Sequence, residues 1–116
     1  MSKVYLTQAG SFHAKHSHDG ALAEAAHEHE FHYEATFYGA INEERFLVDF
    51  RQISDLFKTR LEKGLNGSDL STFLPYPTVE SLAIWLYERI KAQMPKLYSV
   101  KVSEDTDRWV EYRGEE

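Results

Sequence analysis

Residues 27–38 alternate strictly between two faces, which restricts the chain to folds that contain a long, half-buried strand. One face carries His27, His29, Phe31, Tyr33, Ala35 and Phe37, and the other carries Glu28, Glu30, His32, Glu34, Thr36 and Tyr38. A period of two is typical of a strand with one face on the core. The aromatic content of 14% also suits a β-rich fold, because large side chains pack well on sheet faces.

An earlier strand is predicted over residues 3–14, where β-branched and aromatic side chains alternate with polar ones. His16 continues the parity of Phe12 and Ala14. Residues 17–26 break this alternation with Asp-Gly and a run of small side chains, so they are expected to form a loop between the two strands.

The middle of the chain changes to helical spacing. A short strand is expected over residues 46–50, and Asp49 with Gln52 matches the capping box that begins a helix. Apolar residues then recur at helical spacing, which predicts a helix over residues 50–63 that ends at Gly64.

The last third of the chain predicts one more helix and two more strands. After a loop over residues 65–76, Thr78 is a good N-cap for a helix that ends before Pro95. Strands are expected over residues 97–103 and 108–112. The predicted order is therefore ββααββ, an α+β fold.

Length and composition exclude several classes of protein. A chain of 116 residues suits one domain, residues 1–116, and a net charge of −6 argues against nucleic-acid binding, because phosphates require clustered Lys and Arg. With no cysteine, a metal must be bound by His and carboxylates. No apolar run approaches the ~20 residues of a membrane span, so we expect a cytoplasmic protein without membrane contact.

All six histidines lie between residues 13 and 32, which suggests a metal site. His27 and His29 share one face of a strand, with backbones roughly 6.5–7 Å apart, close enough for both to reach one ion. A third imidazole from the neighbouring strand would complete a three-histidine zinc site with an open fourth position. His16 fits best by parity, and His18 and His13 are the alternatives. A histidine-rich surface stretch would have a similar sequence.

Several short motifs, in order along nearly the whole chain, resemble the 6-pyruvoyl-tetrahydropterin synthase and 6-carboxy-tetrahydropterin synthase family. They are Phe12-His-Ala14-Lys-His16, His27-Glu-His29, Val48-Asp49-Phe50, Pro77-Thr78-Val-Glu80-Ser-Leu82-Ala83 and Val102-Ser-Glu104-Asp105. The resemblance implies the tunnelling fold, in which a four-stranded antiparallel sheet carries two helices on one face. It also implies assembly into a barrel, as a homohexamer built from a dimer of trimers, with pterin sites at subunit interfaces.

The same resemblance implies roles for particular residues. His16, His27 and His29 would bind Zn²⁺, and Glu104 would anchor the pterin. One carboxylate can accept two parallel N–H bonds from a 2-amino-pyrimidinone edge, as it does from arginine. Judged without the family, Glu104 would be read as a solvated turn residue.

The chain departs from the family pattern at the positions that carry catalysis. Ala23 stands where the family has its cysteine, and Asn66 and Gly67 stand where relatives have an Asp-His pair. Glu24 precedes His27 by three residues, which resembles a branch of the family in which a glutamate replaces the cysteine. Glu24 is therefore the candidate proton carrier, with an exposed loop residue as the alternative.

Two functions follow from this pattern. One is a zinc-dependent pterin lyase that acts on 7,8-dihydroneopterin triphosphate or a close derivative. The other is a catalytically inactive homologue that binds zinc and pterin and has a binding or assembly role.

Overall fold

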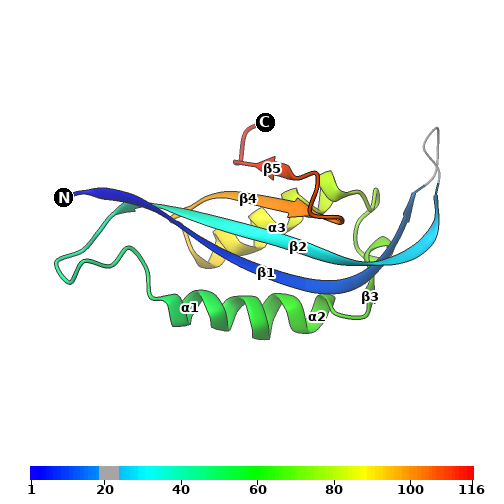
Figure 1. The fold of residues 1–116 in the computed structure, drawn as a ribbon, viewed down its shortest axis with the longest axis horizontal. Coiled ribbons are helices and arrows are strands. Elements are labelled where there is room, and N and C mark those ends of the chain that lie inside the picture. Colours follow the sequence, from blue (N-terminus) through cyan, green and yellow to red (C-terminus); the bar gives the residue numbers. More distant parts are fainter. Residues whose placement is uncertain (19–23) are drawn as a thin grey trace.

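A computed structural model describes residues 1–18 and 24–116, and for residues 17, 18 and 24–26 it describes the backbone alone. The two longest elements are β1 (Lys3–His18) and β2 (Glu24–Ala40), which pair antiparallel along most of their length. They twist along the long axis of a molecule that measures 51 × 28 × 25 Å (Figure 1). The long strand predicted from residue 27 is therefore present and begins three residues earlier.

The sheet has five strands in the order β3-β1-β2-β4-β5. Strands β4 (Leu97–Ser103) and β5 (Val110–Tyr112) extend it antiparallel beyond β2. At the other edge, the two-residue strand β3 (Ser68–Asp69) runs parallel to β1.

The expectation of a four-stranded, wholly antiparallel sheet was wrong because of β3. The backbone N–H of Gly67 donates to the carbonyl of His13 at 2.7 Å, and Asn66 Oδ1 accepts the N–H of His13 at 2.9 Å. These bonds fix the chain against the open edge of β1. A pairing of two residues is too short to show an alternation in sequence.

The first helical stretch is made of α1 (Phe50–Asp55), the π-helical segment η1 (Leu56–Glu62) and α2 (Lys63–Leu65). These follow one another as a single rod below the sheet in Figure 1. Asp49 caps the rod by accepting the N–H of Arg51 at 2.8 Å. The predicted strand over residues 46–50 does not form, because the chain turns there to reach this cap.

The second helix, α3 (Val79–Gln93), begins after a short 3₁₀ turn, η2 (Leu70–Thr72). Thr78 is its N-cap and accepts the N–H of Ser81 at 3.1 Å, as the sequence predicted. The helix ends at Gln93, and its C-cap, Met94, is the residue before Pro95.

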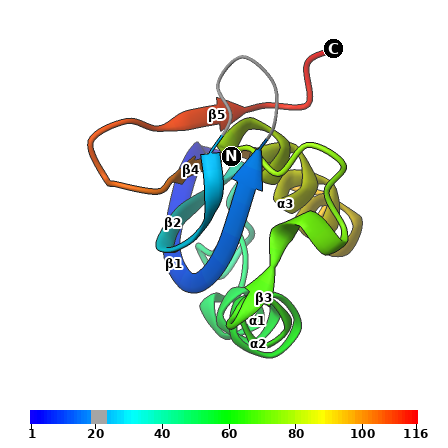
Figure 2. The ribbon, with the colours of Figure 1, turned by 90° about the vertical axis from the view of Figure 1, so that its right-hand side faces the viewer.

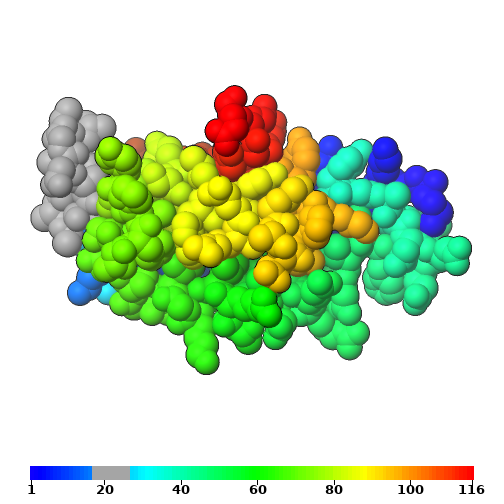
Figure 3. All heavy atoms as spheres, turned by 180° about the vertical axis from the view of Figure 1, so that it is seen from behind, coloured from blue at the N-terminus to red at the C-terminus, as the bar shows by residue number. Residues whose placement is uncertain are grey.

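The helical rod and α3 lie on the same side of the sheet (Figure 2), and from behind they cover most of the molecule (Figure 3). The core between these layers is formed by fully buried side chains, among them Phe12, Phe31, Tyr33, Phe37, Phe57, Leu82, Leu86 and Ile90. The rings of Phe12 and Phe31 stack across the two long strands with centroids 5.5 Å apart. In residues 1–18 and 24–116, no helix has the length and hydropathy that crossing a bilayer requires.

Candidate metal centre

Three imidazoles meet at the end of the core, on the face that the helices cover. The register of the long strands pairs His16 directly with His27 and Ala14 with His29. Because His27 and His29 are two residues apart, both side chains lie on the same face as His16. The ring centroids lie 4.5 Å apart for His16 and His27, 5.3 Å for His16 and His29, and 4.3 Å for His27 and His29.

An aromatic side chain of the core packs against these rings. The ring of Phe31 packs edge-on against His16, with centroids 5.2 Å apart. The side chain of His16 is only 3% exposed, while His29 is about one-third exposed. The centre is therefore buried at His16, on β1, and accessible to solvent at His29, on β2.

A carboxylate from the other end of the sequence joins the cluster. Glu104 follows β4, and the pairing of Ser103 with His32 brings it beside β2. Its Oε2 lies 2.9 Å from Nε2 of His16 and 3.6 Å from Nε2 of His29. One ligand atom from each of His16, His27, His29 and Glu104 can be chosen so that all four lie within 4.8 Å of one another.

The hydrogen bond of His16 indicates that this cluster suits a cation. Its Nδ1 lies 3.0 Å from the carbonyl oxygen of Pro77, which can only accept, so Nδ1 carries a hydrogen. In the neutral ring, Nε2 then presents a lone pair to the Glu104 carboxylate, and two acceptors would face each other at 2.9 Å. A proton or a metal ion between them removes this conflict. Three imidazoles and a carboxylate are the ligands that zinc prefers, so these residues fit such an ion.

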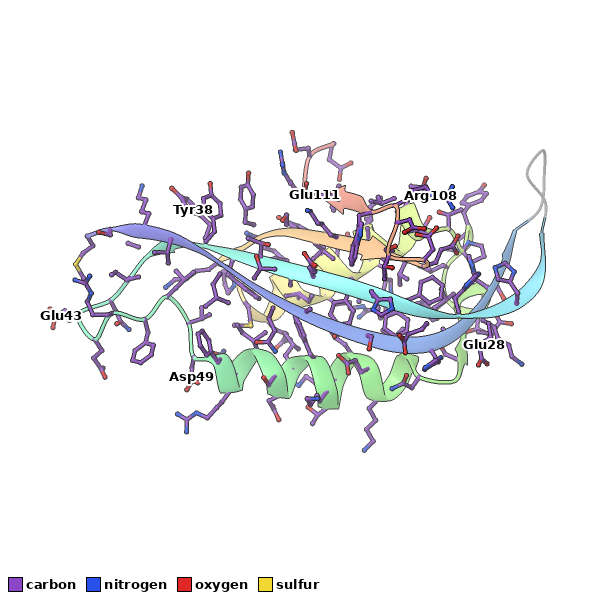
Figure 4. All side chains as sticks on the ribbon, viewed as in Figure 1. Glu28, Tyr38, Glu43, Asp49, Arg108 and Glu111 are labelled. Carbon is purple, nitrogen blue, oxygen red and sulfur yellow. The ribbon has the colours of Figure 1, made fainter. Side chains whose placement is uncertain are left out.

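The turn after β4 fixes the position of Glu104. Ser103 Oγ accepts the N–H of Thr106 at 2.7 Å, and Asp105 Oδ1 accepts the N–H of Arg108 at 3.0 Å. The Arg108 guanidinium also donates to Asp105 Oδ2 at 2.8 Å and lowers the pKa of that carboxyl well below its usual range. Glu28 and Arg108 are labelled at this end of the sheet in Figure 4.

The remaining candidate residues from the sequence are not part of this cluster as the structure describes it. His13 faces away from the cluster, and the backbone of Glu24 pairs with His18 at the start of β2. The side chains of Glu24 and His18, and all of Ala23, lie outside the described residues. Asn66, through its side-chain Oδ1, and Gly67, through its backbone N–H, bind the backbone of His13 at the edge of β1.

Sequence reasoning missed two parts of this centre. The carbonyl of Pro77 orients His16, and a backbone acceptor has no signature in the sequence. The brace between Asp105 and Arg108 was also missed, although a Ser-x-Asp segment after a strand is a common turn signal.

Several known proteins are similar to this chain in sequence. Residues 5–115 match the family 6-pyruvoyl tetrahydropterin synthase. The chain is 26% identical to 6-pyruvoyl tetrahydrobiopterin synthase of Drosophila melanogaster, over 96% of this chain and 80% of that protein. It is 28% identical to dihydroneopterin monophosphate aldolase of Pyrococcus furiosus, over 80% of each chain.

Solved structures share the fold. The 6-pyruvoyl tetrahydropterin synthase of Caenorhabditis elegans is 17% identical and superposes with a TM-score of 0.87, covering 99% of this chain and 98% of that one. The 6-pyruvoyltetrahydropterin synthase of Plasmodium vivax, in a variant with a catalytic glutamate replaced by alanine, is 11% identical and superposes with a TM-score of 0.80, covering 97% and 98%. From the match over residues 5–115, this chain belongs to the 6-pyruvoyl tetrahydropterin synthase family.

Proposed function

We propose that this protein is a zinc-dependent lyase that acts on 7,8-dihydroneopterin triphosphate or a close derivative. Members of its family are lyases of pterin biosynthesis, and the expectation of an enzyme of this type agrees with that membership. The observation that carries the proposal is the grouping of three imidazoles and one carboxylate, whose ligand atoms all lie within 4.8 Å of one another.

His16, His27 and His29 are the proposed zinc ligands. The Pro77 carbonyl holds the His16 ring with Nε2 directed toward the centre. When bound there, zinc would act as a Lewis acid that polarises the side-chain oxygens of the substrate. Because β1 and β2 are a continuous antiparallel pair, the three rings are held with little freedom, as a preorganised site requires.

Glu104 is the proposed anchor for the pterin. Its carboxylate can accept two parallel N–H bonds from the 2-amino-pyrimidinone edge, and the turn braced by Arg108 keeps it close to the histidines. Binding the heterocycle at this distance would bring its side chain next to the metal centre. Glu104 would thus select the substrate and orient it.

Glu24 is the proposed proton carrier. In a retro-aldol cleavage, a base takes the proton of a side-chain hydroxyl as the adjacent C–C bond breaks, and a proton is returned to the carbon that stays on the pterin. Support comes from the sequence, where Glu24 precedes His27 by three residues. It also comes from the 6-pyruvoyltetrahydropterin synthase of Plasmodium vivax, in which a glutamate is a catalytic residue.

A binding protein without catalysis is the second candidate. Ala23 cannot transfer a proton, and neither can Gly67. The side-chain Oδ1 of Asn66 accepts a hydrogen bond from the backbone N–H of His13, which is a structural role. This candidate keeps the zinc and pterin sites and gives them a binding or assembly role.

For assembly, we propose a homohexamer, a dimer of trimers with pterin sites between subunits, on the basis of the family resemblance. Sedimentation velocity measures this directly. A monomer at the concentration of the activity assay would contradict it.

Product analysis after incubation with dihydroneopterin triphosphate separates the two functions. For a lyase, we expect turnover by the zinc-loaded protein and a loss of about 10²–10⁴-fold in Glu24→Gln, the usual contribution of a general base. Glu34→Gln is the matched control, since Glu34 lies on the face of β2 opposite to His27 and His29. Tight pterin binding without turnover would support the binding protein.

A further inference from the structure

The turn that carries Glu104 contains a residue in a strained conformation. Thr106 has a φ of 65°, in the left-handed region of backbone space. A β-branched side chain is disfavoured there, because its Cβ approaches the following carbonyl oxygen. Such a conformation persists only where surrounding contacts impose it, and it is found most often at binding and active sites. The contacts that impose it here are therefore candidates for a functional role.

Both backbone groups of Thr106 are held by side chains. Its N–H donates to Oγ of Ser103 at 2.7 Å, and its carbonyl accepts the indole N–H of Trp109 at 3.1 Å. Ser103 is fully buried and pairs in register with His32 of β2. The start of the turn is therefore tied to the sheet, one residue before Glu104.

Asp105 holds the turn on the other side of Glu104. Its Oδ1 accepts the backbone N–H groups of Asp107 at 2.9 Å and of Arg108 at 3.0 Å, and the hydroxyl of Ser103 at 3.2 Å. Its Oδ2 accepts two N–H groups of the Arg108 guanidinium, at 2.8 and 3.3 Å. One carboxylate thus links the residues before and after it into a closed turn.

The backbone N–H bonds to Asp105 contribute more to this turn than the ion pair does. The side chain of Arg108 is 87% exposed, and an exposed ion pair is weakened by solvent and by the side-chain entropy that it costs. The two N–H bonds to Oδ1 join the side chain to nearby main-chain atoms and order no second side chain. The position of the Asp105 carboxylate is therefore what the shape of the turn depends on most.

We propose that Asp105 is a positioning residue that sets the pterin affinity of the protein through Glu104. This inference rests on the proposed function, in which Glu104 anchors the heterocycle. A carboxylate accepts two parallel N–H bonds only in a defined orientation, so a mobile Glu104 would have to be ordered at each binding event. With Ser103 and Asp105 held on either side of it, Glu104 is ordered when the chain folds.

The test measures the affinity of the zinc-loaded full chain for pterin, which has no side chain to be cleaved, by fluorescence quenching. We expect Asp105→Ala to weaken binding by about tenfold, the upper range for ordering one side chain on binding, with zinc content unchanged. Asp105→Glu keeps the charge but moves the oxygens away from the N–H groups, so it should weaken binding as well. Asp105→Asn keeps an oxygen in the place of Oδ1 and should bind pterin nearly as well as the wild type.

Asp49→Ala is the matched control. Asp49 also accepts a backbone N–H and a guanidinium N–H, both from Arg51, at 2.8 and 3.0 Å, but it caps the helical rod. Both alanine variants should lower the melting temperature, and only Asp105→Ala should weaken pterin binding. Equal weakening in the two variants would overturn the proposal, because a general loss of stability would then explain both.

A third variant separates this inference from the function on which it rests. Pterin affinity that falls in Glu104→Gln but is unchanged in Asp105→Ala and Asp105→Glu would overturn the positioning role and leave the anchor in place. Pterin affinity that is unchanged in Glu104→Gln would instead contradict the anchor itself.

Discussion

Oε2 of Glu104 lies 2.9 Å from Nε2 of His16, so the turn after β4 closes over a centre that begins on β1. The same carboxylate is near enough to His29 to interact with two of the three imidazoles. This position is compatible with two roles, a fourth ligand of the metal or an acceptor for the pterin. The two roles make different predictions for a neutral substitute.

We expect Glu104→Gln to bind zinc nearly as well as the wild type and to bind pterin at least about tenfold more weakly. The amide keeps the shape of the side chain but replaces one acceptor oxygen with a donor, which cannot pair with the N–H groups of the heterocycle. Zinc content by atomic absorption and pterin affinity by fluorescence quenching measure the two effects. Loss of zinc with pterin affinity unchanged would identify Glu104 as a metal ligand.

Removal of the metal should lower the melting temperature of the wild type. The proposed ligands come from β1 and β2, so an ion that binds only the folded chain stabilises it, by about 2.7 kcal/mol at a free concentration of 100 times Kd. Differential scanning calorimetry with and without chelator measures this shift. In His27→Ala, which would lack one of the proposed zinc ligands, the chelator should have no effect. A full shift in that variant would contradict the proposed ligands.

The hydrogen bond between buried Tyr33 and half-buried Glu62 should contribute to stability at neutral pH. The Tyr33 hydroxyl donates to Glu62 Oε2 at 2.6 Å, and Tyr33 is fully buried. We expect Tyr33→Phe to lower the free energy of unfolding by about 1.5–3 kcal/mol at pH 8, the range for a hydrogen bond to a charged group. Urea denaturation measures the difference.

This difference should shrink in alkali. Burial raises the pKa of Tyr33 far above its ordinary value of 10.0, and the hydrogen bond to Glu62 raises it further. Above pH 10, the unfolded chain releases this proton and the folded chain does not, so the stability of the wild type falls as pH rises. Tyr33→Phe lacks this loss. An equal difference at pH 8 and pH 11 would contradict the raised pKa.

Two glycines should respond oppositely to alanine. A Cβ at Gly10 would lie 2.5 Å from Glu62 Oε2 and 2.5 Å from the hydroxyl of Tyr33, whereas a Cβ at Gly64 would meet no atom within 4 Å. We expect Gly10→Ala to destabilise the protein by about 1–3 kcal/mol through overpacking. Gly64→Ala should stabilise it by about 0.5–1 kcal/mol, because Gly64 lies within a helical segment. Thermal unfolding of both variants measures the contrast.

Much of this fold could be predicted from periodicity and caps. The strand over residues 97–103 has the predicted bounds, and Thr78 and Pro95 delimit α3 as expected. Strand β3 escaped prediction because its pairing depends on the backbone of residues that carry no alternating pattern. Residues 46–50 have the composition of a strand, but the chain must turn there to begin the helix at Asp49.

The candidate site was predictable to a smaller extent. Strand parity favoured His16 as the partner of His27 and His29, with His18 and His13 as alternatives, and in the structure His13 faces away from the cluster. Glu104 was nominated only through the family resemblance, because its place beside His16 depends on how β4 pairs with β2. The contact between His16 and the Pro77 carbonyl could not be predicted, because a backbone acceptor leaves no pattern in the sequence.

The stacked rings of Phe12 and Phe31 hold the register of the long strands directly beside the imidazoles. A slip of one residue on β2 would turn His27 and His29 to solvent and force Glu30 and His32 against the aromatic core. Misregistered hairpins would therefore lack both the packing and the ligands of the native protein. Metal affinity can in this way report on correct folding of the hairpin, because a chain that captures zinc at the metal centre must already have aligned its strands.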